Sequence, residues 1–108
     1  MAAEWGPVRV VYAPERPYWN REVLRRNELR RILGNDMVKT MERHGKNLGY
    51  RGPLEGRWFR LDRRTVMLEV TLGGGPVAEA YDYGSDGTLD RVLLAVHPEY
   101  RYRENDRD

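Results

Sequence analysis

The clearest pattern in the chain is a strict alternation of side chains between Thr65 and Leu72. One set is aliphatic and comprises Val66, Leu68, Val70 and Leu72, and the other comprises Thr65, Met67, Glu69 and Thr71. A period of two in β-branched and apolar residues is typical of a strand with one buried face. Three glycines, Gly73, Gly74 and Gly75, then interrupt the pattern before Pro76. Since residues 77–83 can run back beside the first strand, we predict a β-hairpin with a glycine-rich loop.

A second pattern, with a period of four, covers residues 21–48. Apolar residues recur at Leu29, Leu33, Met37 and Met41, which predicts a helix with one apolar face. Asn27 is a candidate N-cap, which leaves residues 23–25 extended. Gly34 is either a break, with Asn35 or Asp36 capping a second helix, or a glycine tolerated in a single helix at ~1 kcal/mol. Because the spacing continues across Gly34, we favour one long helix.

Shorter segments complete the prediction before the hairpin. Residues 8–12 form a strand candidate that Pro14 ends, and a linker with prolines and the aromatic pair Tyr18-Trp19 follows. Residues 45–56 hold four glycines and Pro53, which indicates a loop. Residues 58–61 form a short strand that leads into the hairpin.

The segment after the hairpin begins with a turn at residues 84–87. Apolar residues then follow the spacing i, i+3, i+4, i+7 at Leu89, Val92, Leu93 and Val96. This spacing predicts a short amphipathic helix with Asp86 or Thr88 near its cap, and a strand over 92–96 is the alternative. His44 is expected to be an ordinary surface residue, and residues 100–103 alternate in a way that could add an edge strand.

These elements predict an α+β fold. A small antiparallel sheet, a meander that contains the glycine-rich hairpin, packs against one long helix and a short C-terminal helix. The 108 residues are expected to form a single domain. Within it, residues 1–20 hold the N-terminal strand and the linker, and residues 99–108 form a charged tail.

Composition narrows the possible classes of protein only a little. The net charge of +2, from 19 basic and 17 acidic residues, is too even to indicate a nucleic-acid partner by itself. The chain has no cysteine, which excludes disulfides and thiolate metal sites. It has no apolar run of ~20 residues and no signal peptide, so we expect no membrane partner and an intracellular location. Only Lys39 and Lys46 are lysine, and the other residues counted as basic are arginine. Codon usage explains this excess of arginine more simply than a need for bidentate contacts to carboxylates or phosphates.

No residue set in the sequence identifies a chemistry. Ser85 is the only serine and lies in a predicted turn, while His44 and His97 have no second histidine at metal-ligand spacing. The triple glycine is followed by neither a lysine nor a helix start, so it is not a phosphate loop. We therefore predict no catalytic, cofactor or metal site.

Arginine is concentrated in two clusters. The first contains Arg25, Arg26, Arg30 and Arg31, and the second surrounds Trp58-Phe59 with Arg57, Arg60, Arg63 and Arg64. Arginine interleaved with aromatic residues can bind phosphate and stack on bases. Solvated arginines paired with nearby carboxylates are the more common arrangement, and we favour it here, with Glu22, Glu28, Asp62 and Glu69 as the partners.

Residues 26–33, as the start of a long helix, resemble the opening of small neck proteins of tailed actinobacteriophages. Further matching pieces are Val77-Ala-Glu-Ala-Tyr81, Gly84 and residues 89–93. Those proteins are head-to-tail connector or tail-completion subunits. The resemblance implies a non-enzymatic structural subunit that assembles into a homo-oligomeric ring with neighbouring virion proteins. It also implies a location in the virion after assembly in the host cytoplasm.

The interface residues expected on this basis are arginines, aromatic residues and loop glycines, the first two being enriched at interfaces. They are Trp19, Arg30, Arg31, Trp58, Arg60, Arg63, Arg64, Gly73, Gly74, Gly75, Tyr100 and Tyr102.

A second resemblance points to a different class. Residues 54–60, the hairpin and His97-Pro-Glu-Tyr100 resemble small ribosome-dependent ribonuclease toxins. This resemblance implies RNA binding, with Arg60, Tyr81, His97 and Tyr100 as candidates for phosphate binding and acid–base catalysis. We place it second because the charge of the chain is too even.

Overall fold

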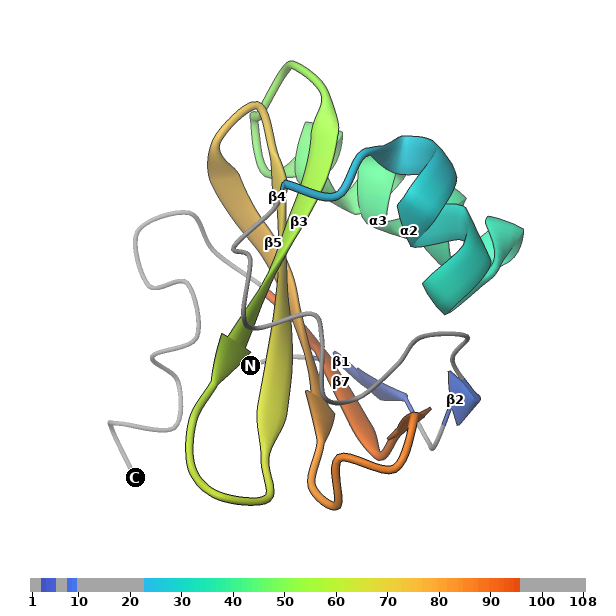
Figure 1. The fold of residues 1–108 in the computed structure, drawn as a ribbon. Helices are drawn as coiled ribbons and strands as arrows, with labels where there is room; N and C mark the ends of the chain where they lie inside the picture. The colour runs from blue at the N-terminus through green and yellow to red at the C-terminus, as the bar shows by residue number, and fades with distance from the viewer. Residues whose placement is uncertain (1–2, 6–7, 10–22, 96–108) are drawn as a thin grey trace.

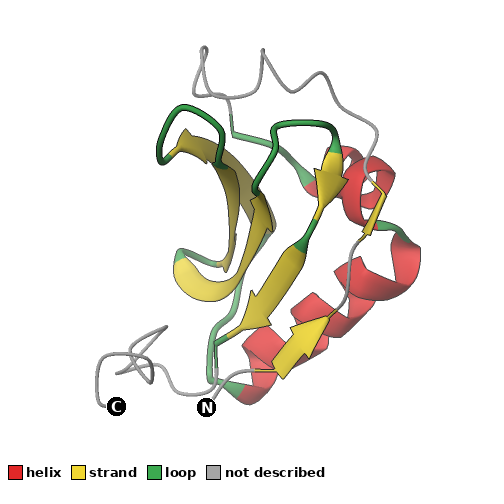
Figure 2. Ribbon diagram, turned by 90° about the horizontal axis from the view of Figure 1, so that it is seen from below, coloured by secondary structure: helices red, strands yellow, loops and turns green. Residues whose placement is uncertain are grey.

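The structure is a computed structural model that describes residues 3–5, 8–9 and 23–95 (Figure 1). Two helices pack on one face of an antiparallel sheet, so the predicted α+β class is confirmed (Figure 2). The helices are α2 (Arg26–Leu33) and α3 (Asn35–Asn47), and the strands are β1 (Ala3–Trp5), β2 (Val8–Arg9), β3 (Leu54–Arg60), β4 (Val66–Leu72), β5 (Gly75–Asp82), β6 (Thr88–Leu89) and β7 (Arg91–Leu94). The strand order of the main sheet is β1-β7-β5-β4-β3, and β2 pairs separately with β6.

The predicted hairpin is formed by β4 and β5. Its loop is shorter than expected, because Leu72 pairs with Gly75 and only Gly73 and Gly74 lie between them. Both have positive φ, 57° and 87°, as a two-residue hairpin turn with the favoured twist requires. The ladder next to this turn contains a β-bulge: Val70 pairs with Ala78, whereas Thr71 pairs with Pro76.

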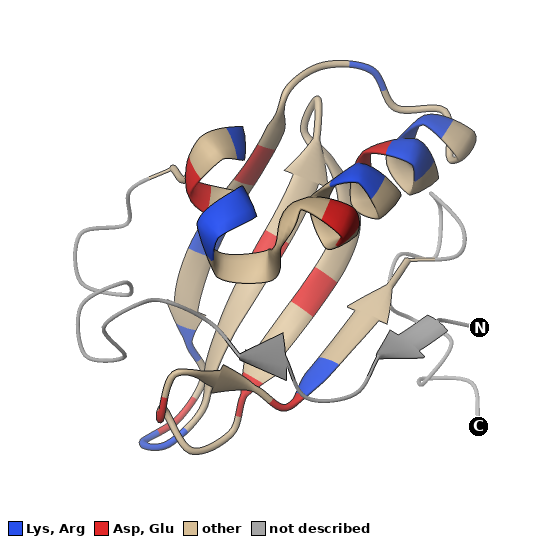
Figure 3. Ribbon diagram, turned by 90° about the vertical axis from the view of Figure 1, so that its right-hand side faces the viewer, with Lys and Arg blue, Asp and Glu red and all other residues tan. Residues whose placement is uncertain are grey.

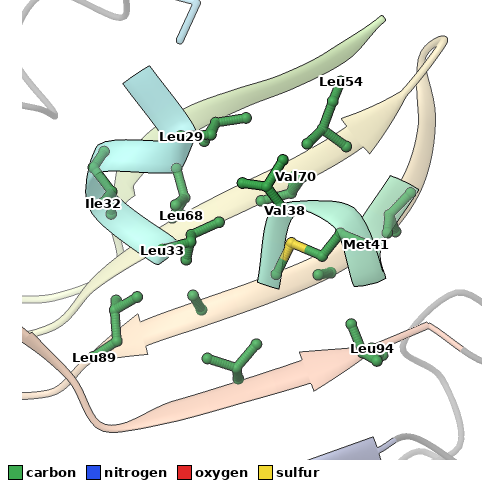
Figure 4. Packing of buried hydrophobic residues seen from close by; sticks show 14 of the residues in the cluster. Leu29, Ile32, Leu33, Val38, Met41, Leu54, Leu68, Val70, Leu89 and Leu94 are labelled. Atoms are coloured by element: carbon green, nitrogen blue, oxygen red, sulfur yellow. The ribbon is translucent and has the colours of Figure 1, made fainter. Parts of the chain in front are cut away.

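The core confirms the predicted facing of the hairpin. The four aliphatic residues of β4 are at most 1% exposed, and they form one cluster with Leu29, Leu33, Val38 and Met41 of the helices (Figure 4). Met37 is only partly buried at the edge of this cluster. The amphipathic face of the helical segment therefore covers the aliphatic face of the hairpin.

The prediction of one long helix is wrong, because Gly34 breaks it. Gly34 has φ 95° and ψ 155°, and α2 ends before it while α3 begins after it. The four-residue spacing survives because both helices place their apolar residues against the same sheet. Asn27 lies inside α2 and is not its N-cap; Arg25 holds that position, and its N–H donates to Glu28 at 2.8 Å.

The extended segment before α2 was predicted correctly. Leu24 forms an isolated antiparallel bridge with Gly56 of β3, through two backbone hydrogen bonds of 2.8 and 2.9 Å. The predicted loop over 45–56 is shorter than expected, since α3 continues to Asn47 and β3 begins at Leu54.

The prediction of a short C-terminal helix is also wrong. Residues 88–89 and 91–94 form β6 and β7, close to the strand that we considered as the alternative. β7 pairs along the free edge of β5, with Ala80 opposite Val92 and Ala78 opposite Leu94. Asp86 and Thr88 therefore cap no helix. β1, which the pattern did not predict, pairs with β7 on its other side.

Several expectations fall partly or wholly outside the described residues. Of the predicted strand over 8–12, only β2 is described. The proline and aromatic linker, the edge strand over 100–103 and the charged tail over 99–108 lie outside the described ranges. Within those ranges, no helix is long and apolar enough to cross a membrane.

Candidate functional site

The face of the sheet opposite α2 and α3 is referred to here as the outer face (Figure 1). Strand register places its side chains in rows that run across β3, β4 and β5. One row is Phe59, Met67 and Tyr81, and the neighbouring row is Arg57, Glu69 and Glu79. Side chains alternate between the two faces along each strand, so these rows point away from the helices.

The exposed large hydrophobic residues of the described chain gather at one end of the outer face. They are Phe59 (41% exposed), Leu61 (51%) and Tyr83 (43%). Leu61 and Tyr83 each lie two residues beyond the row of Phe59 and Tyr81, toward the turns. The rings of Tyr81 and Tyr83 are stacked, with centroids 5.8 Å apart. We define the outer-face patch as Phe59, Leu61, Met67, Tyr81 and Tyr83.

The turns that border the outer-face patch are held by hydrogen bonds. The Asp62 carboxylate accepts from the N–H groups of Arg64 (2.9 Å) and Thr65 (2.8 Å), and these bonds lower the pKa of Asp62. Nη1 of Arg60 donates to the carbonyl oxygens of Asp62 and Arg63. The Ser85 hydroxyl donates to the carbonyl oxygen of Arg64 at 2.6 Å, so the two turns are tied to each other.

The two arginine clusters of the sequence differ in their partners. Arg26 binds Glu42 through two hydrogen bonds of 2.7 and 3.1 Å, and Arg25 approaches Glu55 at 3.4 Å. In the second cluster the exposed side chains of Arg63 and Arg64 make no hydrogen bond or ion pair within the described residues. The first cluster is therefore partly paired, as expected, but with Glu55 and Glu42 in place of the predicted partners, of which Glu22 lies outside the described residues. The predicted pairing fails for Arg63 and Arg64.

The remaining arginine candidates lie on another surface. Arg30 and Arg31 are exposed on α2, where they line a small hollow with Asn27 and Asn35. The helices that carry this hollow cover the inner face of the sheet and present both basic and acidic residues (Figure 3). These two arginines therefore belong to a different surface from Arg63 and Arg64.

The prediction that Trp58 is an interface residue is wrong. It is 4% exposed and belongs to the hydrophobic core, because it shares its face of β3 with Leu54 and Gly56. Its neighbour Phe59 points to the outer face instead.

The loop glycines are explained largely by packing within the chain. A Cβ on Gly73 would lie 1.7 Å from the carbonyl oxygen of Arg51, and a Cβ on Gly75 would lie 2.3 Å from the ring of Tyr50. A Cβ on Gly74 would meet nothing within 4 Å. Of the three, only Gly74 has open space around it. The other candidates, Trp19, Tyr100 and Tyr102, lie outside the described residues.

The residues implied by the ribonuclease resemblance are engaged in local contacts. The hydroxyl of Tyr81 donates to the Glu79 carboxylate at 2.6 Å. Burial, with this hydrogen bond, raises the pKa of the Tyr81 phenol, which makes it a poorer proton donor and keeps it neutral. Arg60 binds its own turn, and His97 and Tyr100 lie outside the described residues.

We predict that the Tyr81 phenol makes stability depend on alkaline pH. Its pKa is raised in the folded protein, so its contribution is fully present below the unfolded pKa of about 10 and is lost as pH rises toward the folded value. Urea denaturation between about pH 9 and pH 11 should show a falling free energy of unfolding, and Tyr81→Phe should flatten this fall. An identical pH dependence in both proteins would contradict the assignment.

Two polar features of the fold were missed in the sequence. Half-buried His44 donates from Nε2 to the carbonyl oxygen of Ala95, 51 residues away, and is not a free surface residue. The carboxylates of Asp82, Asp86 and Asp90 lie within 4.8 Å of one another. They could offer oxygen ligands to a hard cation.

Backbone hydrogen bonds already account for the acidic cluster. Fully buried Asp82 accepts from the N–H groups of Gly84, Asp86 and Gly87. Asp86 and Asp90 accept from Thr88 and Tyr83. Their four-residue spacing is the signal in the sequence, and its meaning was hidden by the prediction of a helix after Asp86.

The described residues thus offer one surface feature that stands out, the outer-face patch beside Arg63 and Arg64. No family model matches the chain, no curated protein matches its sequence, and no solved structure matches its fold.

Proposed function

We propose that this protein is a non-enzymatic structural subunit that acts by protein–protein assembly. The observation that carries the proposal is the outer-face patch, where Phe59, Leu61 and Tyr83 are exposed together next to Arg63 and Arg64. Exposed apolar residues scattered singly are normal, but a contiguous group marks an interaction surface. Aromatic residues, methionine and arginine are also the types enriched in protein interfaces.

The energetics favour an extended contact over a single docking point. Complete burial of a large apolar side chain contributes ~1.5–3 kcal/mol, and the three exposed residues are already about half-buried. Covering them therefore contributes roughly 2–4 kcal/mol, while association costs ~4–15 kcal/mol. The partner must cover the whole patch and add polar contacts, as a neighbouring subunit in an assembly would.

The resemblance to neck proteins of tailed actinobacteriophages supplies the setting of this proposal. In that setting the chain is a neck or tail subunit, its neighbours are further copies and other virion proteins, and assembly takes place in the host cytoplasm. Among the described elements, α2 and α3 cover the inner face of the sheet, and no described helix covers the outer face.

The test is capture of partners by the tagged chain from a lysate of cells that produce the assembly, with identification by mass spectrometry. The triple variant Phe59→Ser, Leu61→Ser, Tyr83→Ser should lose virion structural proteins while it stays folded at the temperature of the capture, because none of the three residues belongs to the buried core; its lowered melting temperature must still lie above that temperature. The double variant Lys39→Ser, Arg43→Ser, at exposed positions of α3, is the matched control. Capture of the same proteins by wild type and triple variant would refute the proposal.

RNA binding is the second candidate function, favoured by one observation. The stacked rings of Tyr81 and Tyr83 share the outer face with Phe59, from which Met67 of β4 separates them, and bases can stack on such aromatic rings. Glu69 and Glu79 lie directly opposite each other in the next row and would repel phosphates, so we rank this function second. Anisotropy with single-stranded RNA should show binding that weakens steeply with salt; no binding at low salt would remove the candidate.

A further inference from the structure

We infer that the solvent face of α2 and α3 binds the phosphate backbone of a nucleic-acid duplex. The even net charge of the chain conceals an uneven distribution between its two layers. Residues 25–51, which hold the helices, contain eight basic and three acidic residues, a net charge of +5. Residues 54–95, which hold most of the sheet, contain five basic and seven acidic residues, a net charge of −2. A basic surface confined to one layer attracts a polyanion, and this second surface is independent of the proposed assembly function.

Three of the basic residues form a row on α3. Lys39, Arg43 and Lys46 follow the spacing i, i+4, i+7, and all three are exposed. Val38 and Met41, on the side of α3 that faces the sheet, are fully buried, so the row points to solvent. The row is roughly 10 Å long at the rise of an α-helix. Figure 3 views the helices from this side and shows Lys and Arg along both of them.

α2 brings two further exposed arginines to this surface. Arg26 binds Glu42 of α3 through two hydrogen bonds of 2.7 and 3.1 Å, and Glu42 lies within the stretch that carries the row. Arg30 lies one turn further along the same side of α2, so this ion pair places Arg30 on the same surface as the row. Its neighbour Arg31 is also exposed, and the two line the hollow where α2 meets α3. We define the basic helical face as Arg30, Arg31, Lys39, Arg43 and Lys46.

The acidic residues of the helical layer leave the charge of this face uncompensated. Glu42 is bound by Arg26, while Glu28 and Asp36 lie in the first turns of α2 and α3, where a carboxylate offsets the positive end of the helix dipole. No residue of the basic helical face makes an ion pair within the described part of the chain. Like charges one turn apart, as in the row, destabilise a helix. A phosphate backbone would neutralise them.

The surface suits a duplex better than a single strand or an acidic protein. Single strands are held largely by aromatic side chains on which bases stack, but the large exposed hydrophobic residues of the described chain belong to the sheet and its turns. A duplex covers its bases and presents a dense, regular array of phosphates, to which rows of arginine and lysine can bind without sequence preference. An acidic protein surface offers sparser charge. The net negative charge of residues 54–95 turns the sheet away from a polyanion.

The test is fluorescence anisotropy of the full chain with a short labelled DNA duplex and, in a second arm, the RNA duplex of the same sequence, over a range of salt concentrations. Wild type should bind at low salt, and the logarithm of the association constant should fall against the logarithm of salt with a slope of about −4 to −5, as five phosphate contacts imply. The triple variant Lys39→Gln, Arg43→Gln, Lys46→Gln should bind at least ~10-fold more weakly, with a slope of about −2. The double variant Arg30→Gln, Arg31→Gln should also reduce the slope, by about 2.

The matched control is the triple variant Arg57→Gln, Arg63→Gln, Arg64→Gln, which removes the same number of positive charges from β3 and its turn and should keep the wild-type slope. Melting temperatures show that each variant is folded. Absence of binding at low salt, or equal weakening by the two triple variants, would overturn the inference. Binding of polyglutamate but not of either duplex would end it in favour of an acidic protein. Capture of virion proteins through the outer-face patch is measured separately, so loss of duplex binding leaves the assembly function standing.

Discussion

Replacing Leu68 with alanine should lower the free energy of unfolding by ~2–5 kcal/mol. Leu68 is fully buried in β4, at the centre of the hairpin, with Trp58 and Ala80 as its cross-strand neighbours. The substitution removes buried methyl groups and leaves a cavity that the small neighbours Gly56 and Ala80 cannot fill. Because a domain of this size has only ~5–15 kcal/mol of stability, urea denaturation should show a large shift of the midpoint.

Met67→Ala is the matched control for Leu68→Ala. Met67 is adjacent in the chain but lies on the outer face and is only half-buried, so less buried surface is lost. It should cost much less, on the order of 1 kcal/mol, in the isolated protein. Equal melting temperatures for the two variants would show that the facing of β4, and with it the register of the sheet, is wrong.

Gly73→Ala should cost roughly 3 kcal/mol or more, although Gly73 lies in an exposed turn. Its added Cβ would lie 1.7 Å from the carbonyl oxygen of Arg51. The backbone fixes the position of a Cβ and the oxygen is itself a backbone atom, so no rotamer change relieves the clash. The N–H of Gly73 also donates to the carbonyl oxygen of Pro53 at 2.9 Å. Relief of the clash must therefore displace the loop over 51–53 and disturb this hydrogen bond.

Gly74→Ala separates this clash from the cost of a positive φ. Gly74 has φ 87° and its added Cβ would meet nothing within 4 Å, so only the cost of the left-handed conformation, ~1–2 kcal/mol, applies. Urea denaturation should give Gly73→Ala a clearly lower free energy of unfolding than Gly74→Ala. The reverse order would contradict the packing of loop 51–53 against the hairpin turn.

The hairpin could be predicted because its determinants are local. Residues 65–72 alternate without interruption, and consecutive glycines supply a turn with two positive φ angles. The helical segment that packs on the hairpin could also be predicted. Its apolar face, with Leu29, Leu33 and Met41, is the kind of surface that covers one face of a sheet.

The errors arose where tertiary contacts decide between two local patterns. Apolar spacing across Gly34 fits one helix or two helices on the same sheet, and only the path of the chain distinguishes them. The spacing at residues 89–96 fits a short helix, but it also places Val92 and Leu94 on one side of a strand. The free edge of β5, which needs hydrogen-bond partners, favours the strand.

The candidate surface was predicted only in part. Arg63 and Arg64 could be named because they lie in a turn, where side chains are exposed. Phe59, Leu61 and Tyr83 lie on one face only because of the register of β3, β4 and β5, and this register could not be predicted from the sequence. Trp58 was misassigned because adjacent residues of a strand point to opposite faces, and the phase of β3 becomes known only from its pairing with β4.

The most direct test of the outer face as the contact surface is a pair of two-dimensional amide NMR spectra of the full chain, recorded with and without a virion protein that the chain captures. The account predicts shifts on addition of that protein that map to Phe59, Leu61, Met67, Tyr81 and Tyr83, with the exposed residues of α2 and α3 unchanged. Shifts confined to Arg30 and Arg31 on α2 would contradict it.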